Sequence, residues 1–308
     1  MIRALVLCAL TSGAAHATAP SEVVLLKCGE TIAYQEVTEE FQERCRVQAR
    51  MISIGPAGLE GVSRIGASTL VVTVGQEALD ALLKSLEKIA PADRPTVVPT
   101  LAFYHPPSDE KMVGPPLSPE PDVILRTLSK VSPRLHKVGM IYGSRSESLV
   151  PIATQAAKTL GLTLEAVRVQ DGPDAVRALR KLGPHVHALW LPPDSDVITP
   201  QVFQFALRLQ LENGVPLLGA TRQQVHSGAL LAVDYSPRSA GRAAAELVNG
   251  LLDGQSANKN ANRNANKSAN AASTQQSHVI ARITVSGQAA RRLGVDLHAL
   301  TEMGAQVE

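Results

Sequence analysis

The sequence predicts an α/β protein of two doubly wound lobes, each built on a parallel sheet, with a ligand cleft between them. Short apolar runs alternate with amphipathic helices along both halves of the chain, as in parallel sheets with helical crossovers. The runs at 70–74 and 230–233 are almost entirely aliphatic, as expected of strands buried on both faces. The proline-rich segment 105–121 can form neither a helix nor a central strand, so it separates the two series.

The first series of elements begins at Val23. Its expected strands cover 23–28, 48–54 and 70–74, followed by one that starts at 96–98 and extends over 101–104. Helices are expected at 30–48 and 77–89. In the second of these helices, leucines recur on one face at the spacing of a helix that covers a sheet.

The second series repeats this alternation. Helices are expected at 122–131, 149–160, 173–182, 200–212, 222–226 and 286–293, and strands at 137–142, 164–169, 187–191, 215–219 and 278–285. Asn213-Gly214 and Gly294 are helix stop signals.

The stretch Gly228–Gly254 contains a strand, a polar loop and a helix in unbroken order. Residues 230–233 form the strand and 234–236 its exit, and either Ser236 or Ser239 caps the helix that follows. In parallel α/β proteins, small ligands bind at the carboxyl end of a strand beside a helix N-terminus. We therefore expect a ligand loop here.

The overall composition is that of a globular protein. The 308 residues are enough for two domains, and 44% of them are hydrophobic and 19% charged. The net charge of +2 creates no strongly basic face, so we expect no nucleic-acid partner. No run reaches the roughly 18 apolar residues that a membrane span requires.

The first residues resemble a secretion signal. Met1 and Arg3 precede an apolar run at 4–10, and the triplet Ala15-His16-Ala17 fits the small-x-small rule of signal peptidase. We expect residues 1–17 to be a signal peptide and the protein to be periplasmic, soluble after cleavage. A buried N-terminal strand is the alternative interpretation.

Export would leave two cysteines in an oxidising compartment. Cys28 ends a predicted strand and Cys45 the helix that follows it, so they lie at opposite ends of a βα unit. A disulfide needs Cα atoms within about 7 Å. We therefore expect two thiols.

A low-complexity segment occupies residues 256–277. Ala-Asn recurs every four residues, with Lys259, Arg263 and Lys267 in step. This spacing matches one helical face, but asparagine is a poor helix former and no apolar stripe is present. We expect a disordered insert.

The polar exits of the predicted strands are the candidate ligand site, because the carboxyl ends of two facing parallel sheets meet at a shared cleft. In the loop 143–146, glycine admits a ligand to the backbone, and Ser144 and Ser146 can receive a carboxylate. Asp194 can hold an ammonium group, and Tyr235 can stack on a flat ligand. Asp196 has an alternative role as the cap of the helix that begins near Thr199.

Catalytic and metal sites are not expected. His185 and His187 face one side of a strand, but without a third ligand they are more consistent with surface imidazoles. No nucleophile elbow, phosphate loop or zinc-protease motif is present. Cys28 at a strand exit suggests a racemase-like nucleophile, but its partner acid/base would have to come from the facing lobe, and Cys45 lies in the same lobe.

Four segments point to a family. They are "KVGMIYG", "LWLPPDSDV", "NGVPLLGATRQQVHSGALLAVDYSPRSAGRAAAELVNGLLDGQ" and "ITVSGQAARRLGV". Together these segments resemble the ABC-transporter substrate-binding proteins that include tryptophan- and tyrosine-linked uptake proteins. The resemblance spans most of the chain after residue 17 and is most specific in the second half. The 3% aromatic content gives no support for an aromatic ligand.

The resemblance implies a periplasmic-binding-protein type I fold. Lobe 1 would comprise 18–112 and 235–255, and lobe 2 would comprise 113–234 and 278–308. The ligand contacts that it implies are Gly75, Gln76, Ser144, Ser146, Asp194, Thr221, Asp234 and Tyr235. It further implies a non-catalytic monomer without a cofactor, which binds a small amino-acid-like molecule and docks on a membrane permease. The alternative is a periplasmic sensor or envelope interaction module, for example one that signals to a sensor kinase.

Overall fold

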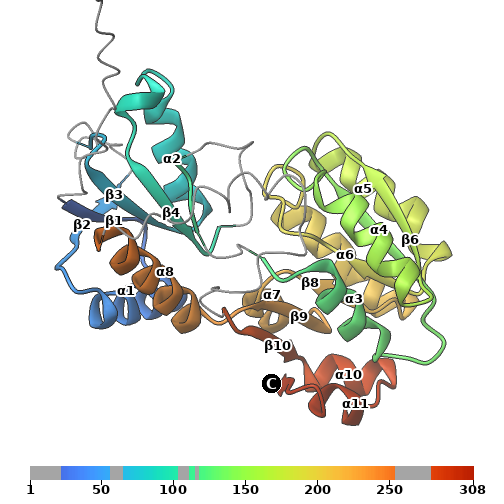
Figure 1. The fold of residues 1–308 in the computed structure, drawn as a ribbon. Helices are drawn as coiled ribbons and strands as arrows, with labels where there is room; N and C mark the ends of the chain where they lie inside the picture. Colours follow the sequence, from blue (N-terminus) through green and yellow to red (C-terminus); the bar gives the residue numbers. More distant parts are fainter. Residues whose placement is uncertain (1–21, 56–64, 103–110, 115–117, 254–278) are drawn as a thin grey trace, which may run out of the picture.

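The computed structural model describes residues 22–55, 65–102, 111–114, 118–253 and 279–308. Two α/β lobes lie side by side, as the sequence predicts (Figure 1). The expected signal peptide, the Asn-rich insert and positions 103 and 104 of the expected strand extension lie outside the described residues.

Lobe 1 contains a four-stranded parallel sheet in the order β2-β1-β3-β4. Its elements are β1 (Glu22–Cys28), α1 (Ile32–Arg44), β2 (Arg50–Ile54), β3 (Thr69–Val74), α2 (Gln76–Leu86), the short 3-10 helix η2 (Pro91–Asp93) and β4 (Thr96–Thr100). The central strand β3 is buried at every position, because helices cover both faces of the sheet.

Helix α8 (Pro237–Leu252) packs on lobe 1, although it follows a strand of lobe 2. It lies beside α1 (Figure 1). A Cβ added to Gly241 would lie 2.5 Å from the carbonyl oxygen of Val37, so the two helices approach at backbone distance. Ala244 and Val248 share a core with Phe41 of α1. The chain thus leaves lobe 2 after Tyr235 and enters lobe 1 at Pro237.

A buried carboxylate joins the same two helices. Glu40 of α1 is 5% exposed, and its side chain lies 3.1 Å from Arg44, 3.3 Å from Arg242 and 3.6 Å from Arg238. Burial of Glu40 opposes its ionisation, but the hydrogen bond from Arg242 and the charges of Arg44 and Arg242 outweigh it. The pKa of Glu40 therefore lies below its ordinary value of 4.5.

Glu40→Gln is expected to lower the free energy of unfolding by about 1 kcal/mol at pH 7, since the arginine partners are about half exposed and screened by water. A carboxylate with a depressed folded-state pKa stabilises the protein above its unfolded-state pKa and loses this effect as the pH falls. The difference should therefore shrink as the pH falls below 4.5 in urea titrations. Glu43→Gln, an exposed position of the same helix, is the control. A difference independent of pH would contradict this assignment.

Lobe 2 contains a seven-stranded sheet in the order β11-β10-β9-β8-β7-β5-β6. Its elements are α3 (Pro121–Ser129), β5 (Lys137–Tyr142), α4 (Leu149–Thr159), β6 (Thr163–Arg168), α5 (Gly172–Leu182), η3 (Gly183–His185), β7 (Ala188–Trp190), α6 (Pro200–Asn213), β8 (Leu217–Gly219), α7 (Arg222–His226), β9 (Leu231–Tyr235), β10 (Ala281–Val285), α10 (Gly287–Leu293), α11 (His298–Thr301) and β11 (Gln306–Val307). Neighbouring strands are parallel except β9 and β10.

Two apolar cores lie on the two faces of this sheet. On one face of the sheet, the buried side-chain amide of Gln210 links α6 to the backbone at the start of β8 and just before β9. The Gln210 side chain donates to the Gly228 carbonyl (2.8 Å) and accepts from the N–H groups of Leu217 (3.0 Å) and Leu230 (2.9 Å). Its polar atoms are therefore satisfied where water is excluded.

The structure corrects several sequence expectations. β10 is antiparallel to β9, so the sheet of lobe 2 is mixed. β4 ends at Thr100 and does not extend, because Leu101 has a φ of +48°, outside the extended region. Asp196 does not cap α6, since Thr199 fills that role with its hydroxyl accepting from Val202 N–H. Ser236 occupies the N-cap position of α8 without a side-chain hydrogen bond.

Across the described ranges, no helix is both long and apolar enough to cross a membrane.

Candidate functional site

A loop at the carboxyl end of β5 is organised by one buried carboxylate. Asp194 is 2% exposed, and its Oδ2 accepts from the backbone N–H groups of Gly143 (3.0 Å) and Ser146 (3.1 Å) and from the Ser146 hydroxyl (2.7 Å). A Cβ at Gly143 would lie 2.8 Å from Val197, so only glycine fits there. Two predicted ligand residues thus meet, but they bind each other. Asp194 therefore anchors the loop 143–146, and its expected role as an ammonium ligand stays a prediction.

The same loop reaches the other lobe. Arg145 donates to both carboxylate oxygens of Asp80 in α2 (3.2 and 3.0 Å) and to Asp196 of its own lobe (2.8 Å). Partial burial disfavours the charge of Arg145, but hydrogen bonds and the charges of Asp196 and Asp80 keep its pKa above the ordinary value. The edge of lobe 2 that carries this loop therefore faces α2 of lobe 1.

On lobe 1, the predicted residues lie at the start of α2. Gly75 has a φ of +89°, which favours glycine, and a Cβ there would lie 2.2 Å from the Tyr34 hydroxyl. Gln76 donates to Asp80 (2.8 Å), so it belongs to the group that meets Arg145. Burial, followed by the charges of Glu77 and Cys28, raises the pKa of Tyr34. Neither Tyr34 nor Asp80 stood out in the sequence, because both lie on helices instead of strand exits.

Thr221 and Asp234 hold the ends of β8 and β9. The Thr221 hydroxyl caps α7 by accepting from Gln224 N–H. Asp234 accepts from Arg222 N–H (3.0 Å) and forms a two-pronged ion pair with Arg282 (2.8 and 2.9 Å), its neighbour on β10. The Asp234 carboxylate is therefore used within lobe 2.

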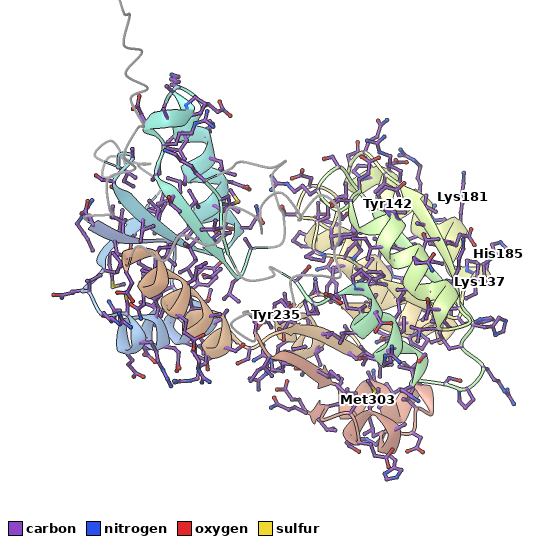
Figure 2. All side chains as sticks on the ribbon, viewed as in Figure 1. Lys137, Tyr142, Lys181, His185, Tyr235 and Met303 are labelled. Carbon is purple, nitrogen blue, oxygen red and sulfur yellow. The ribbon has the colours of Figure 1, made fainter. Side chains whose placement is uncertain are left out.

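Tyr235 ends β9 two residues before α8 begins, at the junction of the lobes (Figure 2). Burial, reinforced by the charge of Glu120, raises the pKa of Tyr235 to about 12. Its side chain is half-buried, and no described residue hydrogen-bonds its hydroxyl. The phenol therefore stays neutral at physiological pH and is able to donate a hydrogen bond.

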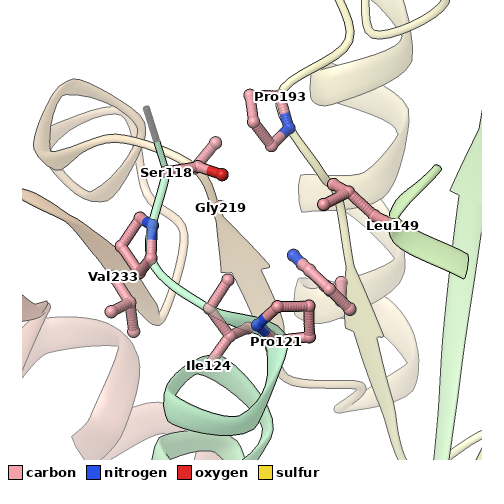
Figure 3. A pocket seen from close by; sticks show the side chains of 10 residues that line it. Ser118, Pro121, Ile124, Leu149, Pro193, Gly219 and Val233 are labelled. Atoms are coloured by element: carbon pink, nitrogen blue, oxygen red, sulfur yellow. The ribbon is translucent and has the colours of Figure 1, made fainter. Parts of the chain in front are cut away.

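A hollow lies among these loops, at the carboxyl ends of β7, β8 and β9 (Figure 3). It encloses about 350 Å³, the open solvent at its mouth included. Its lining is mainly apolar and consists of Ser118, Pro119, Pro121, Ile124, Leu149, Trp190, Pro193, Gly219, Ala220 and Val233. None of the predicted ligand residues lines it, but Asp194, Thr221 and Asp234 each directly follow a lining residue in the chain.

Histidine and cysteine side chains take no part in this site. His187 lies against His136, with ring centroids 4.0 Å apart, and His185 is on the side of lobe 2 remote from lobe 1 (Figure 2). Within the described ranges, no group of three His, Cys, Asp or Glu side chains is placed to hold a metal ion. Cys28 and Cys45 are free thiols, as predicted. Burial and the charge of Glu77 raise the pKa of Cys28, which makes it a poor nucleophile.

Solved structures share this fold at low sequence identity. An ABC domain from Streptococcus pneumonia, in complex with L-Trp, is 15% identical and has a TM-score of 0.63, with 94% of this chain and 99% of that chain covered. A conserved domain protein from Vibrio cholerae is 14% identical with a TM-score of 0.62, at the same coverage. A substrate-binding protein with adhesive properties from Clostridium difficile, ligand-free and open, is 14% identical with a TM-score of 0.60, and 89% and 95% of the chains are covered.

Curated proteins give no significant match. Residues 123–291, more than half of the 308, match the family of ABC transporter substrate binding proteins, which are non-catalytic. The matched range begins in α3 and runs through lobe 2 and α8 into α10, so it includes the loop 143–146, Asp194 and the lining of the hollow from Ile124 onward. The chain therefore belongs to the ABC transporter substrate-binding protein family.

Proposed function

We propose that the protein is the exported solute-binding component of an ABC-type uptake system, holding a small polar, amino-acid-like ligand between its two lobes. The observation that carries this proposal is the ion pair of Arg145 with Asp80, which brings the strand exits of the two lobes to face each other. A cleft between facing parallel sheets is the usual binding place in such proteins. The solved structure of similar fold that holds L-Trp supports an amino-acid-like ligand.

We assign the ligand contacts to Gln76, Ser144, Thr221 and Tyr235. Ser144 is exposed, and Thr221 and Tyr235 retain a hydroxyl that is able to donate. Gly75, Ser146, Asp194 and Asp234 shape and hold the loops that carry these contacts.

Hinge closure is the proposed mechanism. The chain passes between lobes after β4, between β9 and α8, and between α8 and β10. A ligand that contacts both lobes stabilises the closed arrangement more than the open one, so it shifts the population toward closure. The closed monomer then docks on a membrane permease in the periplasm, after removal of residues 1–17, and needs no cofactor.

A thermal-shift screen of the purified protein tests this function. The compounds are the L-amino acids, small carboxylates and nucleosides, each at a saturating concentration. Binding at 100 times Kd adds about 2.7 kcal/mol to stability, which corresponds to a rise in Tm of about 5 °C. If no compound raises the Tm, the proposed function is contradicted.

Tyr235→Phe tests whether the hydroxyl of Tyr235 contacts the ligand. Loss of one hydrogen bond to the ligand should weaken binding about 5- to 10-fold in calorimetric titrations. Tyr142→Phe, the same change at another half-buried tyrosine of lobe 2, should leave the affinity unchanged. Equal affinities of the Tyr235 variant and the unaltered protein would remove Tyr235 from the site.

A further inference from the structure

We propose that the hollow at the ends of β7, β8 and β9 is a subsite for a compact aliphatic group of the ligand, next to which the Trp190 indole N–H donates to an oxygen of the ligand's head group. The ligand class is thus a small carboxylate, with or without an amino group, that has a short branched aliphatic chain. This inference rests on the proposed function, because it concerns the ligand bound between the lobes.

The walls of the hollow favour an aliphatic occupant. Prolines line it on several sides, with Ile124, Leu149 and Val233 between them (Figure 3). Ser118 is the lining residue with a side-chain hydroxyl. A charged group would lose its water there without a compensating partner, whereas an aliphatic group gains from leaving water.

The indole of Trp190 supplies one polar contact in this apolar surface. Trp190 is 1% exposed as a whole residue, and the structure gives its N–H no acceptor among the described residues. The indole nitrogen is not one of the fully buried polar atoms that lack a partner, so it is in contact with solvent at the hollow that Trp190 lines. Because the indole nitrogen is a donor only, a ligand oxygen at the hollow would replace solvent as its acceptor.

The position of the hollow connects it to the cleft. Leu149 begins the helix that follows the Arg145 loop, and Pro193 precedes the anchor Asp194. Since Arg145 contacts Asp80, this edge of lobe 2 faces lobe 1. An aliphatic group in the hollow would therefore leave its charged head among the polar loops between the lobes.

The size of the hollow limits the occupant. The hollow has room for about one water molecule, and the 350 Å³ counts all the space between its atoms, open solvent included. One methyl branch of a short aliphatic chain fits in such a space, with the rest of the chain at the open mouth, whereas a large aromatic ring does not fit.

Intrinsic fluorescence gives a direct test, because Trp190 is the only tryptophan in the 308 residues. L-Leucine and 3-methylbutanoate are the probes, and L-serine is the polar comparison. We expect at least one of the two aliphatic probes, but not L-serine, to change the tryptophan emission in a saturable manner. An unchanged emission with both aliphatic probes would overturn the subsite.

Two substitutions separate the subsite from the rest of the cleft. Ala220→Leu fills the hollow and should weaken binding of the aliphatic probe at least 10-fold in calorimetric titrations, whereas Ala92→Leu, the same change at an exposed position of lobe 1, should not. Trp190→Phe keeps an aromatic ring but removes the N–H, and should weaken binding about 5- to 10-fold.

The two proposals fail in different ways. A compound that raises the Tm but binds Ala220→Leu and Trp190→Phe as tightly as the unaltered protein overturns the subsite and leaves the proposed function in place. A screen in which no compound raises the Tm contradicts both.

Discussion

Replacing Asp194 with alanine is expected to lower the free energy of unfolding by about 2–4 kcal/mol and to abolish ligand binding. The carboxylate is buried and accepts from two backbone N–H groups and one hydroxyl of the loop 143–146, with a further contact to Asp196 N–H at 3.3 Å. Alanine would leave these donors without acceptors where water does not reach them. Urea unfolding and calorimetric titration measure the two effects.

The control for this change is Asp196→Ala. Asp196 is about half exposed and pairs with Arg145, so its loss should cost less than about 1 kcal/mol. Asp194→Asn retains one oxygen acceptor and should fall between the two. A small effect of Asp194→Ala on stability would show that the buried hydrogen bonds do not hold the loop.

Gly241→Ala is expected to destabilise the protein by about 1–3 kcal/mol, although alanine is normally the better helix residue. The added Cβ would lie 2.5 Å from the Val37 carbonyl and 3.2 Å from Glu40, so α1 and α8 would have to separate. The displacement of α8 should also affect the lobe junction, because α8 directly follows β9 of lobe 2 in the chain. Denaturant unfolding measures the change.

Gly250→Ala is the matched control in the same helix. No atom lies within 4 Å of a Cβ at Gly250, so the substitution should stabilise α8 by about 0.5–1 kcal/mol. Opposite signs for the two substitutions are expected. Stabilisation by both would contradict the close packing of α1 on α8.

The sequence predicted the elements well where periodicity was clear. The aliphatic run at 70–74 became the buried strand β3, and the leucine spacing after residue 76 became α2. The direction of β10 escaped prediction, because the Asn-rich segment before it carries no signal of how the chain returns. The short elements α11 and β11 were also missed, since four and two residues are too few to show a period.

For the candidate site, the sequence predicted which loops are polar but not the contacts that their side chains make. Glycine and serine after β5 indicated a polar loop, and that loop does face lobe 1. The use of Asp194 within the loop could not be foreseen, because it depends on a fold that brings residues 143 and 194 together. The ion pair of Asp80 with Arg145 could not be foreseen either, because it depends on how the two lobes face each other. Trp190 had a usable signal, as the sole tryptophan of an aromatic-poor chain placed at a strand end.

Small-angle X-ray scattering tests the central claim, that a small molecule is bound between lobes that close on it. The protein is measured alone and with the compound that raises its Tm most. If the ligand contacts both lobes as proposed, it stabilises the closed arrangement and the radius of gyration should fall on binding. A bound ligand that leaves the radius of gyration unchanged would contradict closure around a ligand between the lobes.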